Sequence, residues 1–354
     1  MDIISDWIKR ALSDSQMVLL FFVLFLCVIG VVLFADMLAP VIAAIVIAFL
    51  LDGAVTWLTK RGASHLFSSV MVFIVFSMVS LIVIITILPL LFEQVAQFIN
   101  ATPAMMVSLQ SVLLSLQDKF PELLSADQVH SWFVQLGEEV ANMGPKLLQY
   151  SLSGVTGVLT IAVYMILVPV MVFFFLKDKD QISAWMAGFF PTERGLVTEV
   201  WKESVERAGD YARGKFYEII IVGIVSFAVY QFLGLKFATL LAVVTGFSVL
   251  IPYIGAAIVT LPVALVAYAQ WGFGADLAWT VIAYLILQAL DGNVLVPFMF
   301  SEVVKLHPNA IIVAILIFGG IWGLWGVFFA IPLATMANAV IRAWKNRPNE
   351  LSGT

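Results

Sequence analysis

The chain has 354 residues, of which 62% are hydrophobic and only 12% are charged, and its formal net charge is −5 at pH 7. Soluble domains carry about 25% charged residues, so the composition excludes an ordinary soluble globular protein. The sequence holds no basic arm and no aromatic-basic stripe, which excludes nucleic acid as a partner.

Apolar runs longer than about 18 residues predict membrane-spanning helices, and therefore an all-α polytopic integral membrane protein surrounded by the lipid bilayer. Residues 1–92 are expected to hold three spans, at Met17–Ala35, Met37–Leu58 and Phe67–Phe92. Asp36 and Pro40 predict a tight turn between the first two spans. The first run is too long for a signal peptide and is followed at once by another span, so we expect it to be retained.

Residues 93–150 differ from the runs before them, because acids and amides appear at regular intervals. Apolar residues recur there at helical spacing, which predicts several short amphipathic helices outside the bilayer, separated at Pro103, Pro121 and Pro145. Further along we expect a fourth span at 151–176, a charged helical segment at 177–215, a C-terminal membrane core at 216–344 that begins with a fifth span, and a polar tail at 345–354.

Lysine and arginine mark the cytoplasmic side of a membrane protein when they gather in its short loops. They gather at Lys9-Arg10, at Lys60-Arg61, in 177–215 and at Arg342, Lys345 and Arg347, whereas 93–150 holds few basic residues among many acids. Both termini and the 177–215 segment are therefore expected in the cytoplasm, and the 93–150 segment outside it.

Two acidic residues stand close to the expected membrane boundaries. Asp52 lies near the end of the second span, and Glu218 lies one turn inside the fifth span, near Lys215. Charged side chains in such positions reach back to the interface. We therefore expect an interfacial ion pair of Glu218 with Lys215, and an interfacial Asp52, rather than roles in transport.

Two apolar stretches near the C-terminus are interrupted where a bilayer would have its centre. Leu235–Gln270 is interrupted at Ile251–Gly255, and Leu306–Trp344 at Gly319–Gly326. Broken helices persist in lipid where they line a cavity, and paired breaks are typical of transport sites. Each arm of the first stretch has about 15 residues, short of the ~20 that a span needs. This favours about six transmembrane helices plus two re-entrant helical hairpins, with eight transmembrane helices as the alternative.

The two broken stretches share a layout. Shifting Leu235 onto Leu306 also aligns Gly255 with Gly326. In both stretches a polar start is followed by an apolar arm, a break containing glycine, a second apolar arm and a proline. If both are hairpins, the span at Leu277–Phe300 between them gives the two copies opposite orientations, as in the inverted repeats of secondary transporters.

An acid between the two breaks is the leading candidate for function. An ionised carboxylate near the bilayer centre costs several kcal/mol unless it is paired, hydrated or protonated, so Asp291 predicts a proton, cation or solute site; the alternative is an acid that caps a broken helix end. The residues expected to line a transport path are Asp291, Gln288, Asn293, Gly292, Pro252, Tyr253, Gly255, Gly320, Trp322 and Trp325. An ordinary proline kink at Pro252, and a helix-packing surface at the glycines near Trp322, are the alternatives there.

Enzyme signatures are missing from the sequence. No motif belongs to a hydrolase, a zinc enzyme or a phosphate-binding ATPase, so we expect neither enzyme activity nor a cofactor, and no ATP-driven pump. The three histidines are far apart in the sequence and predict no metal site. A single cysteine, Cys27, excludes an intramolecular disulfide.

Four segments carry a resemblance to a known family: Val168–Lys179, Gly246–Gly255, Gln288–Asn293 and Phe318–Ala334. With a likeness that extends over nearly the whole chain, the sequence resembles the PerM-type permeases of the autoinducer-2 exporter family. The resemblance implies a transporter of the bacterial inner membrane; some members are linked to export of autoinducer-2 and others to sodium–proton antiport. It also implies a ring-like homo-oligomer, a pentamer in particular, but it supplies no binding residues.

Together these observations predict a secondary transporter or exporter of small polar solutes, such as autoinducer-2, with ion coupling through Asp291 as a hypothesis. Two alternatives stay open. The chain could be a sodium–proton antiporter or form a channel-like ring. It could also be a membrane scaffold or regulator that transports nothing and binds partners through 93–150 and 177–215, although Asp291 and the two breaks speak against this.

Overall fold

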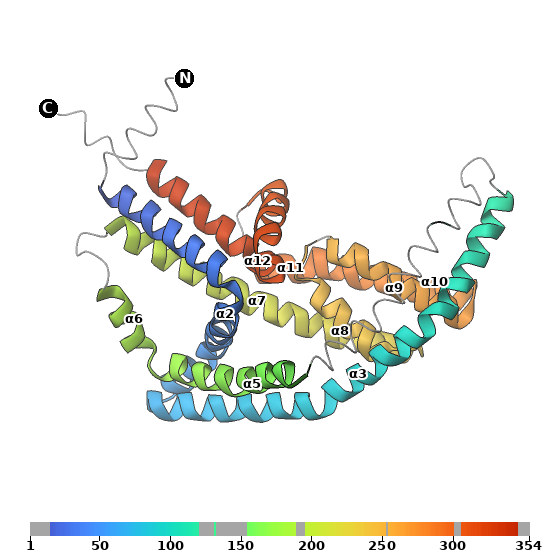
Figure 1. The fold of residues 1–354 in the computed structure, drawn as a ribbon, viewed down its shortest axis with the longest axis horizontal. Coiled ribbons are helices and arrows are strands. Elements are labelled where there is room, and N and C mark those ends of the chain that lie inside the picture. Colours follow the sequence, from blue (N-terminus) through green and yellow to red (C-terminus); the bar gives the residue numbers. More distant parts are fainter. Residues whose placement is uncertain are drawn as a thin grey trace, which may run out of the picture. The chain divides into compact units, whose positions relative to one another are not determined.

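The computed structural model describes the backbone of residues 15–119, 131, 154–188, 195–252, 254–300 and 306–345. In this part of the chain the regular elements are all helices (Figure 1), which confirms the predicted all-α class. The elements are α2 Ser15–Lys60, α3 His65–Lys119, α5 Gly154–Lys177, α6 Lys179–Gly188, α7 Gly195–Phe232, α8 Ala238–Ser248, α9 Ile254–Trp271, α10 Ala275–Leu290, the π-helical turn η1 Asp291–Leu295, α11 Val296–Phe300 and α12 Pro308–Lys345.

Within the described ranges, six helical segments are long and apolar enough to cross a membrane, and this confirms a polytopic membrane protein. They are Met37–Lys60, His65–Ser111, Val205–Phe232, Ile254–Trp271, Ala275–Phe300 and Pro308–Ala339. The helix α8, with 11 residues, is about 16 Å long at 1.5 Å per residue and is too short to cross about 30 Å of hydrocarbon.

Two prolines that the sequence places at boundaries lie inside helices. The first two expected spans lie in α2, where two helices meet at a kink with non-helical backbone at Phe34 (φ −117°, ψ 20°), close to the predicted turn, while Pro40 lies inside the second of them. The predicted separation at Pro103 is wrong, because α3 continues through that residue to Lys119. A proline removes one backbone hydrogen bond and bends a helix, but the turns on either side can continue it. Pro121 and Pro145 lie outside the described residues.

The described helices divide into two compact units, and each is described separately. Unit 1 is Met1–Ile74, Ile166–Phe216 and Met299–Thr354, and unit 2 is Val75–Met165 and Tyr217–Phe298.

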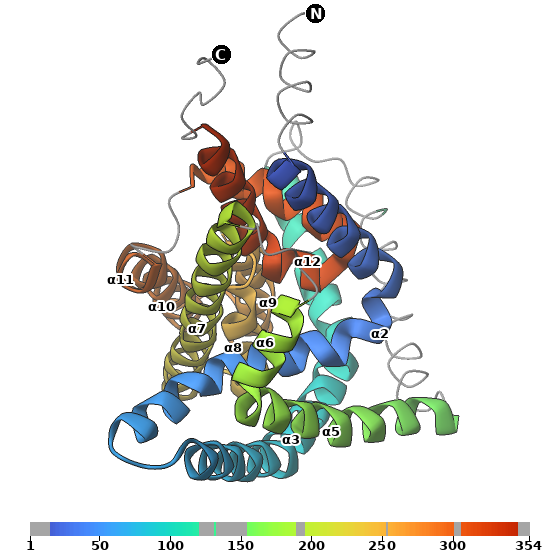
Figure 2. The same ribbon diagram turned by 90° about the vertical axis from the view of Figure 1, so that its left-hand side faces the viewer.

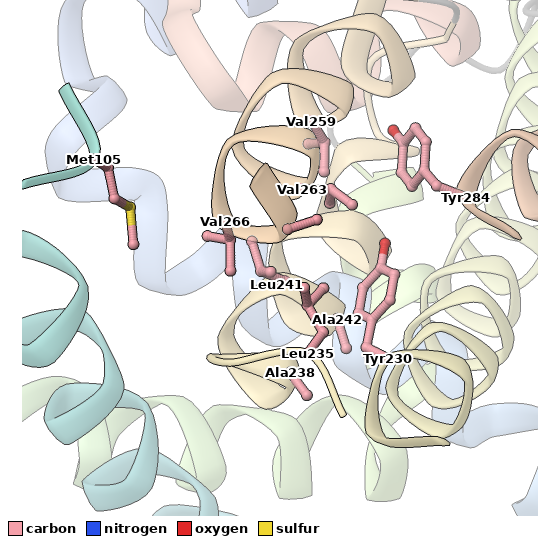
Figure 3. Close-up of a cluster of buried hydrophobic side chains, with 11 residues drawn as sticks. Met105, Tyr230, Leu235, Ala238, Leu241, Ala242, Val259, Val263, Val266 and Tyr284 are labelled. Atoms are coloured by element: carbon pink, nitrogen blue, oxygen red, sulfur yellow. The ribbon is translucent and has the colours of Figure 1, made fainter. Parts of the chain in front are cut away.

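The core of unit 2 forms around α8 and α9. Buried side chains from both helices meet there, with Tyr230 of α7 and Tyr284 of α10 beside them (Figure 3). The cluster consists of Met105, Tyr230, Leu235, Ala238, Leu241, Ala242, Val259, Val263, Val266, Ala267 and Tyr284. Because lipid tails are as apolar as these side chains, close packing rather than escape from water holds the helices together in a membrane.

In unit 1 the last turn of α2, the first turn of α3 and the last turn of α5 pack together. Ser68 and Ser69 of α3 are fully buried. Ser68 Oγ lies 3.4 Å from Thr59 Oγ1 of α2, and Ser69 Oγ lies 3.5 Å from the Leu176 carbonyl oxygen of α5. The ends of these three helices therefore lie at one level.

The short helix α6 turns sharply away from the end of α5 (Figure 2). Lys179 at its start forms an ion pair with Asp52 of α2, with 2.7 Å between Nζ and Oδ2. The expected interfacial charge of Asp52 is thus paired with a lysine far along the sequence, which local spacing does not predict.

Candidate functional site

The first interrupted stretch is a turn between α8 and α9 in unit 2. The amides of Leu250 and Ile251 donate back to the carbonyls of Phe247 and Ser248, which closes the end of α8. Gly255 at the start of α9 is buried, and a Cβ atom there would overlap the carbonyl oxygen of Ser248. Only glycine permits this approach of the two arms. Pro252 lies in the turn, whereas Tyr253 lies outside the described residues.

The second interrupted stretch is a bend inside α12 in unit 1, whose two arms diverge from Gly323 (Figure 1). Gly323 has φ 59° and ψ −136°, a backbone conformation that favours glycine. A Cβ atom on Gly326 would overlap the carbonyl oxygen of Phe318. Both breaks therefore share one feature: a glycine after the break packs directly against a carbonyl oxygen before it. Gly255 and Gly326 are also the two glycines that the sequence shift aligns.

The α10 helix holds the first turn of α9 in unit 2. The two helices follow one another through a short connection and pack together. Tyr284 of α10 is 1% exposed, and its hydroxyl donates to the Ala256 carbonyl oxygen at 2.5 Å. Thr260 Oγ1 donates to the same oxygen at 2.9 Å. Figure 3 shows the Tyr284 hydroxyl directed at α9, as this bond requires.

Gln288 and Asp291 follow Tyr284 on the same face of the helix, one and two turns further on. Because α9 and α10 are antiparallel neighbours and Tyr284 is already opposite Ala256, this face comes level with the turn between α8 and α9. The structure thus brings Gln288 and Asp291 to the same level as Pro252 and Gly255. The Gln288 Nε2 atom is buried and has no hydrogen-bond partner in the described part of the chain. Buried donors without acceptors are rare and mark sites of function or strain.

Asp291 opens the π-helical turn η1, and its Oδ1 atom is buried. The amide of Val296 donates to the Asp291 carbonyl oxygen, five residues back. The next residue is Pro297, which has no amide hydrogen, so an α-helix would lose a bond there in any case. Such π-turns often occur at functional sites. The chain stays helical through Asp291, so there is no broken helix end for its carboxylate to cap.

Gly292 and Asn293 serve the turn itself. Both are exposed, and the side-chain amide of Asn293 donates to the Ala289 carbonyl oxygen at 2.8 Å. A Cβ atom on Gly292 would meet nothing within 4 Å. Of the four candidates in this segment, Gln288 and Asp291 are therefore the ones with buried polar atoms.

The aromatic candidates of the second break lie in unit 1. The rings of Trp322 and Trp325 lie 6.1 and 6.3 Å from the ring of Phe329 and are nearly parallel to it. The Trp322 Nε1 donor is buried without a partner among the described residues. Gly320 is exposed and a Cβ atom there would meet nothing within 4 Å. Helix packing thus explains Gly326 but not Gly320.

The burial of three polar residues was not predicted from the sequence. Lys215 and Glu218 are 4% and 1% exposed, so their side chains are buried and not exposed at the interface as expected; their pairing with each other stays a prediction. Both belong to the membrane-spanning segment Val205–Phe232. Tyr230 is also fully buried, with its hydroxyl 3.0 Å from Thr245 Oγ1. Single hydroxyls inside apolar runs give no periodic signal, so only their neighbours in space reveal them.

Among the residues described, no group of three His, Cys, Asp or Glu side chains is placed to hold a metal ion.

Comparison with known proteins gives a match along nearly the whole chain. The model of the family described as "AI-2E family transporter" matches residues 19–346. PerM of Escherichia coli (strain K12), named as a permease, is 42% identical over 345 residues, which cover 97% of this chain and 98% of PerM. YueF of Bacillus subtilis (strain 168), named as a transport protein, is 25% identical over 315 residues, which cover 87% of this chain and 84% of YueF.

Proposed function

The chain belongs to the AI-2E transporter family, and from this premise we propose that it is a secondary transporter that moves a small polar solute across the bacterial inner membrane. The family and its named relatives support membrane transport rather than enzyme activity. The name of the family supports autoinducer-2, or a solute like it, as the cargo, while the names of the relatives support transport alone. Fold and family alone do not fix a substrate, so the proposal depends on the residues of the site.

The observation that carries the proposal is the pair Gln288 and Asp291 beside the turn between α8 and α9. A buried amide donor without an acceptor suits a solute oxygen, which would complete its hydrogen bonding. An acid inside a membrane-spanning segment is expensive to keep ionised and is by default a functional site. We assign Gln288 to solute binding and Asp291 to a proton or cation that accompanies the solute.

The two breaks support movement around such a site. Each arm is a helix that meets its partner at a single glycine, Gly255 or Gly326, so a change at the turn need not disturb the hydrogen bonds inside either arm. Irregular backbone of this kind is found in secondary transporters where it lines the substrate path. In unit 1, Trp322 is a separate candidate for contact with the solute, because its indole N–H is buried without a partner among the described residues.

Transport in proteoliposomes tests this assignment. Purified protein is reconstituted with a pH-sensitive dye inside, and labelled autoinducer-2 and a sodium gradient are supplied as separate probes. Asp291→Asn keeps the size of the side chain but cannot carry a charge, so we expect at least a tenfold loss of flux and loss of its pH dependence. Asp276→Asn, at the exposed opposite end of α10, is the matched control and should behave like the unchanged protein.

The same assay separates the alternatives. Proton flux driven by sodium without solute would favour an antiporter, for which Asp291 is also the natural site. Ion flux that does not saturate would favour a channel-like ring. If the Asp291→Asn protein transports at the normal rate with the normal pH profile, the coupling role is wrong. If no probe moves at all, a scaffold becomes the better explanation.

The resemblance also supports a homo-oligomer, a pentamer in particular, and the distribution of lysine and arginine supports termini in the cytoplasm. The mass of the purified protein in a mild detergent, measured by light scattering with the detergent subtracted, tests the subunit number. A mass of one chain under conditions that preserve transport would contradict it.

A further inference from the structure

Basic and aromatic residues gather in unit 1 at the turn between α2 and α3, and Figure 2 shows this turn. We call it the α2–α3 corner and define it as residues 57–67. The packing of Ser68 on Thr59 and of Ser69 on the end of α5 fixes its position. Trp57, at 53% exposed, the cations Lys60 and Arg61, and His65 lie on its surface.

The positive charge of the corner is not neutralised by nearby acids. Among the described residues neither Lys60 nor Arg61 has a carboxylate within 4 Å. The two neighbouring lysines differ: Lys177 lies 3.5 Å from Asp178, and Lys179 is paired with Asp52. The guanidinium of Arg61 lies 3.7 Å above the ring of Trp57, an arrangement in which the ring holds the cation in place without quenching its charge.

Apolar side chains continue the corner toward the membrane. Leu66 and Phe67 are 54% and 55% exposed. The corner joins the ends of two membrane-spanning segments, Met37–Lys60 and His65–Ser111. Lysine, arginine and tryptophan at span ends lie at the level of the lipid headgroups, so Leu66 and Phe67 face the acyl chains just below the cations.

We propose that the α2–α3 corner binds an anionic phospholipid, with Lys60 and Arg61 on the headgroup phosphate and Leu66 and Phe67 against the acyl chains. The planar guanidinium matches the oxygens of a phosphate, and the ring of Trp57 holds it in that orientation. A free anion would need only the cations. The exposed apolar side chains beside them are what favour a lipid.

Lipid titration of the purified full-length protein in a neutral detergent tests the proposal. Native mass spectrometry counts bound phosphatidylglycerol, and phosphatidylcholine serves as the neutral lipid. Each lysine or arginine near an anionic membrane surface contributes about 1 kcal/mol, or about fivefold in affinity. We therefore expect Lys60→Gln with Arg61→Gln to weaken the tightest phosphatidylglycerol binding about 25-fold, and 0.5 M sodium chloride to weaken it as well.

Lys236→Gln is the matched control, because Lys236 is exposed between α7 and α8 and has no carboxylate within 4 Å in the described part of the chain. It should leave the binding unchanged. If the double variant does not fold, Arg61→Gln alone takes its place, with a fivefold loss expected. The proposal fails if the double variant binds phosphatidylglycerol as tightly as the unchanged protein, or if phosphatidylcholine binds equally well. It also fails if millimolar inorganic phosphate displaces the lipid, since the site would then be one for free anions.

Discussion

Gly255 and Gly326 occupy positions that no side chain can share without moving the backbone. At each, the missing side chain lets one arm of a broken helix rest on a carbonyl oxygen of the other arm. Other glycines in the same stretches, such as Gly320, have free space around them. The distinction separates glycines that a bend requires from glycines that an apolar sequence merely contains.

Gly326→Ala should lower the free energy of unfolding by more than about 2 kcal/mol, because its methyl group would overlap the Phe318 carbonyl. Gly320→Ala is the control. A methyl group at this position meets no other atom within 4 Å, and alanine is a better helix former than glycine by about 1 kcal/mol, so this variant should not lower the free energy of unfolding. Thermal unfolding in detergent, followed by circular dichroism, measures both. Equal melting temperatures for the two variants would show that the close approach in α12 is not real.

The short helix α8 is held at its base by other elements of unit 2. Gln94 of α3 accepts a hydrogen bond from the Leu240 amide at 2.8 Å, inside the first turn of α8. Phe237, just before α8, has φ 58° and packs edge-on against Phe98 of α3 at 5.6 Å. Gln270 at the end of α9 bonds to the backbone of the connection before α8, through the Lys236 amide and the Gly234 carbonyl. The base of the hairpin is thus fixed by polar contacts to backbone groups.

Gln94→Ala should destabilise the protein by about 1 kcal/mol, as the loss of a helix cap does, because the Leu240 amide loses its acceptor. Gln97→Ala on the same helix is the matched control: its side chain is exposed and bonds only to Glu93, one turn away. Such a pair contributes about 0.2–0.5 kcal/mol. Chemical unfolding in mixed micelles measures the difference. If Gln97→Ala costs as much as Gln94→Ala, the bond from α3 does not hold α8.

At the scale of the whole molecule, the sequence predicted what depends on local pattern and missed what depends on distant neighbours. The apolar runs predicted the helices, and the turn residues predicted the positions of both breaks. The pairing of Asp52 with Lys179 joins residues 127 apart, so no spacing rule could predict it. The burial of Glu218 depends on helices packed around α7. The sequence identified Asp291 because an acid is rare in an apolar run. Its position at the same level as Gly255 could not be predicted, because it depends on how α9 packs against α10.

The path of the chain through the membrane is the prediction at this scale. A variant with Cys27→Ala receives single cysteines at His307 and at Phe273, which is 75% exposed, and is treated with an impermeant thiol reagent in sealed vesicles of each orientation. If both broken stretches are re-entrant hairpins, the cysteine at His307 reacts only from the cytoplasmic side and that at Phe273 only from outside. Cysteines at Ala63 and Lys236 are the controls: in either topology the first is expected on the cytoplasmic side and the second on the outer side. The reverse result at both test positions would require eight full spans.

The π-turn at Asp291–Leu295 has a consequence for how relatives of this protein compare in length. A π-turn closes its hydrogen bond over one residue more than an α-turn, so it takes up one extra residue while the helix after it keeps the direction of a regular helix one residue shorter. Phe300 in the helix that follows packs 5.6 Å from the ring of Tyr211. Deletion of Asn293 should therefore leave Phe300 facing Tyr211, whereas deletion of a residue from the regular turns of α10 should rotate Phe300 by about 100° around the helix axis. In evolutionary terms the turn is a one-residue insertion, and a relative that lacks it should show a single alignment gap at this place.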